Sequence, residues 1–166
     1  MDHSYILPFV KSINNVFETM LQSKVRIGKP ILKKSGSPHY DVSGIIGMSG
    51  DVEGTIVLSF PTKVAETCVK KFVGIDLPSD HEDFADAIGE LVNMVTGNAK
   101  AEFQNKKVSI TCPSVVIGQG HIVFGSKDVV CIDIPCDCEH GHFVLEVGLK
   151  QGTGAAKETV AEVSAA

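Results

Sequence analysis

Residues 83–106, DFADAIGELVNMVTGNAKAEFQNK, decide the fold, because they predict one long amphipathic helix. At roughly 100° per residue, apolar side chains fall in an arc about 120° wide along this helix. They are Phe84, Ile88, Leu91, Val92, Val95, Ala99 and Phe103. We expect this stripe to be buried against the core of the protein.

The other side of the helix carries a different set of residues, in an arc about 80° wide that is centred roughly 160° from the apolar stripe. The set consists of Asp86, Glu90, Asn93, Gly97 and Lys100. A glycine inside a helix costs about 1 kcal/mol relative to Ala, so Gly97 is unusual there. Because Gly97 has no side chain, the helix surface beyond Asn93 is predicted to be flat and open to another macromolecule.

Glu90 and Asn93 stand three residues apart, so their side chains project side by side from the helix. A carboxylate can bind a cation, and a neutral amide can both donate and accept hydrogen bonds. Such a pair can position a water molecule, but it makes neither a nucleophile nor a strong base. Any chemistry would therefore rest on orientation. On spacing alone, such a pair is more often part of an ordinary solvated helix face.

The composition favours one globular domain that binds neither nucleic acid nor membrane. A chain of 166 residues, 43% of them hydrophobic, can bury a sizeable core. A net charge of −5 and an aromatic content of 6% argue against a nucleic-acid surface. No apolar run reaches the roughly 18 residues of a membrane span, and residues 1–15 do not form a signal peptide. We expect a cytoplasmic protein with reduced cysteines.

Around the long helix, the sequence predicts an α/β fold with a mostly antiparallel sheet. Apolar spacing predicts a first helix over 5–24 and a shorter one over 62–73. Extended segments are predicted at 31–32, 42–49, 54–60, 108–112, 115–118, 121–124 and 128–134, and a last one at 142–149 closes the sheet. Pro113 confines its strand to an edge or a bend, and Ser79 or Asp80 is expected to cap the long helix. The result is a two-layer domain over 1–150, with two long helices and a shorter one on the sheet, followed by a flexible tail over 151–166.

The run Asp86-x-x-x-Glu90-x-x-Asn93, followed by Gly97 and then Pro113, resembles the signature of the CheC/CheX/FliY phosphatases of bacterial chemotaxis. The first helix does not repeat the pair, because Leu21 stands where the amide would be. With one such site, and with its segment order over about residues 5–150, the chain is most similar to the CheX branch of this family.

This resemblance implies a phosphatase that removes the phosphoryl group from the aspartate of a phosphorylated CheY-like receiver domain. It implies that Asn93 orients the attacking water and that Glu90 contacts the receiver's active-site Lys. Asp86, Gly97 and Lys100 would contact the receiver beside them, although Asp86 is equally well explained as an acid favoured by the helix dipole. The receiver would bring Mg²⁺, so no cofactor is expected in this chain. The resemblance also implies a homodimer.

Two other functions stay open. The same fold could bind a response regulator without catalysis. The segment Cys136-Asp137-Cys138-Glu139-His140-Gly141-His142, which has no counterpart in the family pattern, could instead form a small zinc or thiol module. The Cys-x-Cys spacing makes a cramped chelate, however, and a polar hairpin turn is the simpler explanation.

Overall fold

In the computed structural model, which describes residues 3–154, three helices pack on one eight-stranded antiparallel sheet. The helices are α1 (His3–Met20), α2 (Thr62–Val73) and α3 (Glu82–Ala101). The strands are β1 (Arg26–Ile27), β2 (Ile31–Leu32), β3 (Val42–Gly50), β4 (Val52–Phe60), β5 (Val108–Ile110), β6 (Ser114–Ile117), β7 (Cys131–Cys138) and β8 (Gly141–Gln151). The strand order is β1-β7-β8-β4-β3-β5, with β2 also on β7 and β6 also on β3.

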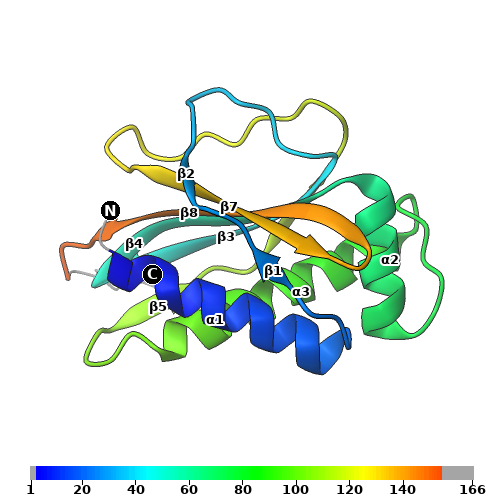
Figure 1. The fold of residues 1–166 in the computed structure, drawn as a ribbon. Coiled ribbons are helices and arrows are strands. Elements are labelled where there is room, and N and C mark those ends of the chain that lie inside the picture. The colour runs from blue at the N-terminus through cyan, green and yellow to red at the C-terminus, as the bar shows by residue number, and fades with distance from the viewer. Residues whose placement is uncertain (1–2, 155–166) are drawn as a thin grey trace, which may run out of the picture.

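The helices and the long loops lie on opposite sides of the sheet. Figure 1 shows α1 and α3 side by side across one face, with α2 at one end of the molecule. The connections that follow β2 and β6 lie on the other face. The predicted fold class, two long helices and a shorter one on an antiparallel sheet, is therefore confirmed.

The core lies between the helices and the sheet. All seven apolar residues of the predicted stripe are buried, and Phe103, the most exposed of them, keeps only 8% of its surface accessible. On the neighbouring helix, the ring of Phe17 stacks on that of Phe143 with centroids 4.8 Å apart, and Phe60 stacks on Phe143 at 5.1 Å. These aromatic contacts join α1 to β8 and β4, since aromatic side chains bury a large apolar area.

The helix ends differ from the predicted ones for local reasons. α1 ends at Met20 rather than at residue 24, because Gln22 adopts a positive φ of 53° and turns the chain away. α3 ends at Ala101 rather than at residue 106, and Asn105 is likewise left-handed with φ 58°. Neither Ser79 nor Asp80 caps α3. His81 takes that position, and its Nδ1 accepts a hydrogen bond of 3.1 Å from the backbone N–H of Asp83.

Two strand predictions were wrong, whereas the prediction of a bend or sheet edge at Pro113 is confirmed. Residues 121–124 form no strand; instead the backbone oxygen of His121 accepts a hydrogen bond of 3.0 Å from the N–H of His39. β8 does not close the sheet, because it lies between β7 and β4. β5 and β6 both pair with β3, one on each side of Pro113, so this proline interrupts an edge of the sheet as predicted.

The last strand extends just past residue 150, where the sequence analysis ended the domain. β8 continues to Gln151, and the N–H of Gly152 donates a hydrogen bond of 2.9 Å to the backbone oxygen of Asp51. Most of the predicted flexible tail, residues 155–166, lies outside the described part of the chain.

Candidate functional site

α3 is fixed against the sheet by close contacts on its buried side. Gly44 of β3 lies under the helix, where a Cβ atom would come within 2.9 Å of Val92 Cγ1. From the neighbouring helix α1, the hydroxyl of Ser12 donates a hydrogen bond of 2.6 Å to the backbone oxygen of Val95. A helix held in this way presents its outer residues in a defined position.

The outer side of α3 carries the five predicted site residues, and we call this surface the α3 ridge: Asp86, Glu90, Asn93, Gly97 and Lys100. The Asp86 and Glu90 residues are exposed, and the other three are half-buried. Within residues 3–154, no hydrogen bond or ion pair engages any of these side chains. A Cβ atom on Gly97 would meet nothing within 4 Å, so the surface beside Asn93 is as open as the sequence predicted.

One flank of the ridge is formed by a residue from the bent edge of the sheet. Pro113 packs on Gly89 of α3, where a Cβ atom would lie 3.3 Å from Pro113 Cγ and 3.7 Å from Val115 Cγ2. This contact sets Pro113 next to the turn of helix that carries Glu90. Sequence reasoning did not identify Gly89, although a second glycine inside a helix was an available signal, since glycine there allows another chain to approach closely.

The competing cluster at residues 136–142 is divided between two sides of the β7–β8 hairpin. Cys136 is buried and Cys138 is half-buried against the core, whereas His142 is exposed on the opposite face, with its Nδ1 2.9 Å from Asp137 Oδ1. No group of three or more His, Cys, Asp or Glu side chains in residues 3–154 is arranged to hold a metal ion. In this arrangement the side chains of residues 136–142 do not converge as the ligands of the zinc module considered above would.

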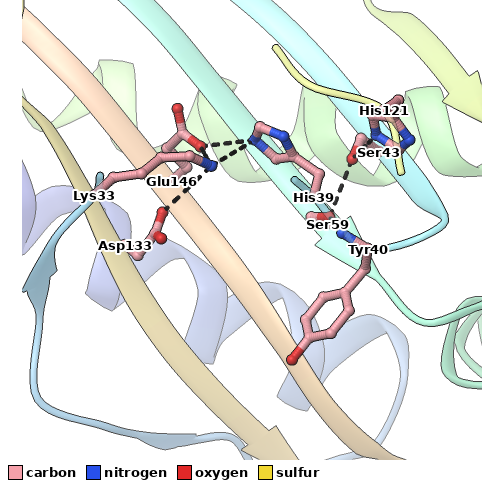
Figure 2. Close-up of polar contacts among 8 residues, drawn as sticks. All are labelled: Lys33, His39, Tyr40, Ser43, Ser59, His121, Asp133 and Glu146. Carbon is pink, nitrogen blue, oxygen red and sulfur yellow. Dashed lines mark hydrogen bonds and ion pairs between the residues drawn. The ribbon is translucent and has the colours of Figure 1, made fainter. Parts of the chain in front are cut away.

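A second polar cluster, which sequence reasoning missed, lies on the loop-covered face of the sheet (Figure 2). Lys33 and His39 from the loop after β2 reach Glu146 of β8: Lys33 Nζ donates to Glu146, and His39 Nε2 lies 2.8 Å from Glu146 Oε2. Nearby, His121 Nε2 lies 2.8 Å from Ser43 Oγ, and its ring stacks on that of His39. We call Lys33, His39 and Glu146 the buried charge cluster, because each side chain is at most 9% exposed.

The electrostatics of this cluster keep Glu146 ionised. Burial raises its pKa, but hydrogen bonds from His39 and Lys33 outweigh that effect and hold the pKa below its usual value. For Asp133, burial raises the pKa despite the opposing charge of Lys33 at 3.9 Å. A cavity of about 380 Å³ adjoins these groups, but Glu146 and His39 are already committed to each other. The cluster therefore fastens the loop to the sheet.

Comparisons with known proteins point to one family. A family model described as "Chemotaxis phosphatase CheX" matches residues 42–137. CheY-P phosphatase CheX of Thermotoga maritima is 30% identical over 122 residues, which cover 72% of this chain and 79% of that protein.

Solved structures extend the agreement to the whole fold. A CheC-like superfamily protein from Shewanella sp. PV-4 superposes with a TM-score of 0.82 at 33% identity, covering 90% of this chain and 99% of that one. The CheX of a CheX–CheY–BeF₃–Mg²⁺ complex from Borrelia burgdorferi shares the fold, with a TM-score of 0.73 at 22% identity over 89% of this chain and 98% of that chain.

The fold is therefore that of the CheC-like superfamily. Within it, the chain belongs to the CheX family of chemotaxis phosphatases. The expectation that it is a phosphatase is confirmed at this level. In residues 3–154, no helix is both long and apolar enough to cross a membrane.

Proposed function

We propose that this protein hydrolyses the aspartyl phosphate of a CheY-like receiver domain and that the α3 ridge is its docking face. The observation that carries the proposal is a pair of side chains on a helix fixed to the sheet: the exposed Glu90 and the half-buried Asn93, both without a partner within residues 3–154. The similarity to a CheY-P phosphatase of Thermotoga maritima supports the choice of substrate.

Asn93 orients the attacking water in this proposal. In phosphoryl transfer, most of the protein's contribution is positioning and charge stabilisation. An amide that holds a water in line behind the phosphorus suits that task, as a glutamine does in GTPases. The neutral Asn93 side chain can accept a hydrogen bond from the water while its NH₂ group donates to a phosphoryl oxygen.

Glu90 docks the receiver by pairing with its active-site Lys. A hydrogen bond between charged groups contributes about 1.5–3 kcal/mol when water is excluded from it. Asp86 places a negative charge at one end of the ridge, and Lys100 places a positive charge at the other end. Gly97 leaves room for the receiver's backbone.

Mg²⁺ and the phosphoryl group enter with the receiver. The Borrelia complex, which contains CheX, CheY, BeF₃ and Mg²⁺, supports this division of roles. We further propose that the protein acts in the cytoplasm, together with its receiver. The homodimer also stays a prediction, and light scattering over a range of concentrations checks it.

The decisive experiment mixes the protein with a phosphorylated CheY-like receiver and Mg²⁺ and follows the loss of phosphate over time. Wild-type protein should accelerate dephosphorylation, and the Asn93→Ala variant should not. Equal rates for the two proteins, with receiver binding retained in both, would instead identify a binding module without catalysis.

A further inference from the structure

The β7–β8 hairpin and helix α2 bring two cysteines together at one end of the molecule. Cys68 lies on the buried side of α2 and is 0% exposed, and Cys138 is the half-buried last residue of β7. The hairpin turn rests directly on α2, because a Cβ atom on Gly141 would come within 2.7 Å of Val64 Cγ2. Across this contact the side chains of Cys68 and Cys138 lie close enough to affect each other's ionisation. The Cys138 thiol also donates a hydrogen bond of 3.5 Å to the backbone oxygen of Gly141.

The surroundings of Cys138 favour its thiolate. The contact with Cys68 lowers the pKa of Cys138 most, burial opposes it, and the backbone N–H groups of His140 and Gly141 and the His140 ring lower it further. The same contact, together with burial, raises the pKa of Cys68. Because Cys138 is half-buried and Cys68 is fully buried, Cys138 is the sulfur that a small oxidant can reach, and Cys68 is the thiol beside it. Redox-sensitive cysteines have this arrangement.

The two other cysteines of β7 lack these features. Cys136 faces the same side of β7, but burial raises its pKa to about 12. Cys131, at the start of β7, is half-buried like Cys138, and burial followed by the charge of Glu146 raises its pKa. Accessibility alone therefore does not distinguish Cys138. Its distinguishing features are the donors of the hairpin turn and the contact with Cys68.

We propose that Cys138 and Cys68 are a redox-modification site that closes to a reversible disulfide when a hydroperoxide oxidises it. In the first step, the Cys138 thiolate attacks the peroxide O–O bond, giving a sulfenic acid and releasing hydroxide, or alkoxide from an organic peroxide. In the second step, the sulfur of Cys68 attacks the Cys138 sulfur, the S–S bond forms, and the oxygen leaves as water. A dithiol returns both residues to thiols by exchange.

The fold permits this closure with a local movement. A disulfide requires a sulfur separation of about 2.0 Å, and Cys138 stands where β7 gives way to the turn at Glu139 and His140. The bridge would join α2 to the β7–β8 hairpin, two segments that otherwise meet only through side-chain packing. The bridge does not involve the α3 ridge. Its test can therefore fail while the proposed phosphatase activity is confirmed, and the reverse is also possible.

The test treats the reduced full-length protein with hydrogen peroxide at pH 7 and maps its peptides by mass spectrometry without reductant. The expected product is a peptide pair joined through Cys68 and Cys138, which dithiothreitol separates. Cys138→Ser should abolish this pair, and Cys131→Ser, a change at a half-buried cysteine of the same strand, should leave it intact. Cys68→Ala should leave a sulfenic acid on Cys138 that dimedone traps.

A second measurement on the unmodified sequence avoids reliance on variants that could fold poorly. Iodoacetamide at pH 7 should alkylate Cys138 at least about tenfold faster than Cys131, because one unit of pKa changes the thiolate fraction about tenfold. Equal alkylation rates would overturn the proposal. So would a peroxide-induced bridge that omits Cys68 or Cys138, or the lack of any intramolecular bridge in protein with native circular dichroism.

Discussion

Gly44 of β3 lies directly against Val92 of α3, so close that a Cβ atom on the glycine would come 2.9 Å from Val92 Cγ1 and 3.3 Å from Ile88 Cγ2. Val92 precedes Asn93 in the sequence, and Ile88 lies one turn before it. The missing side chain of Gly44 therefore sets how far the α3 ridge stands above the sheet, and the site depends on a residue on the far side of the helix.

Replacing Gly44 with alanine should destabilise the protein and displace the ridge. Overpacking a close-packed core costs about 1–3 kcal/mol, and the β-branched Val92 cannot rotate away easily. Urea denaturation should show a loss of this size, with receiver dephosphorylation slowed at the same time. Gly125→Ala is the control, because its new Cβ atom would meet only Cys131 Sγ, at 3.8 Å. Unchanged stability of Gly44→Ala would contradict the close packing.

Replacing Asn93 with alanine should reduce turnover about 100-fold while receiver binding changes little. The reaction depends on the orientation of the attacking water, and a small displacement of a reacting group lowers the rate by about this factor. Stopped-flow dephosphorylation and a binding titration with a BeF₃-treated receiver separate the two effects. Asn98→Ala is a matched control, since Asn98 is exposed on the same helix about 140° away from Asn93. Turnover that falls equally in both variants would remove Asn93 from its assigned role.

The sequence was sufficient to predict α3 and its two faces, because the apolar period of a long helix is a strong local signal. It was insufficient for features that depend on distant contacts. His81 replaces Ser79 or Asp80 as the cap, since ring nitrogens can accept the N–H that hydroxyl and carboxylate groups usually take. The 121–124 segment contains β-branched residues, but the backbone oxygen of His121 accepts a hydrogen bond from His39 and its ring contacts the Ser43 side chain, so the segment joins no strand ladder.

The buried charge cluster likewise could not be predicted from the sequence, because its residues lie far apart in the chain. Lys33 and Glu146 are 113 residues apart in the chain, and nothing near either residue indicates the other. Pro113, by contrast, was recognised as a strand interruption from its own chemistry, but its contact with Gly89 needed the fold to bring the sheet edge to the helix. Local chemistry predicts elements, and only the folded chain shows which of them surround a site.

Replacing Glu90 with glutamine should weaken receiver binding about tenfold, which corresponds to about 1.4 kcal/mol, because the charge-assisted hydrogen bond becomes a neutral one. The loss should shrink as salt is added, since salt screens the exposed pair. Titrations of the receiver at two salt concentrations measure both effects. Glu18→Gln on α1, also exposed and also unpartnered within residues 3–154, should behave like the wild type.

Replacing Glu146 with glutamine should destabilise the fold by about 3 kcal/mol at pH 7, because it leaves the buried Lys33 with only the more distant carboxylate of Asp133, 3.9 Å away. The pKa of Glu146 is lowered in the folded state, so its ionised form stabilises the protein above the pKa of the unfolded chain, about 4.3. That contribution disappears as the pH falls through the lower folded pKa.

The stability gap between this variant and the wild type should therefore close in acid. Asp133 acts in the opposite direction, because its raised pKa means that the native state gains stability as the pH falls toward the unfolded pKa of this group. Urea denaturation of both proteins from pH 7 down to about pH 3 measures the gap. A gap that stays constant with pH would show that lost packing, rather than lost charge, causes the effect.

Replacing Gly97 with alanine should make the protein more stable, by about 1 kcal/mol, because alanine is the better residue inside a helix and its Cβ atom would meet no other atom within 4 Å. A longer side chain at this position should keep part of that gain and yet block the receiver. Gly97→Gln is therefore expected to raise the melting temperature while it weakens receiver binding more than tenfold. Asn98→Gln places the same side chain on α3 outside the ridge and should leave binding unchanged. Stability and binding change in opposite directions only if the open surface beside Asn93 is kept for a partner. An α3 ridge that served merely as a solvated face would gain stability from Gly97→Gln and lose nothing.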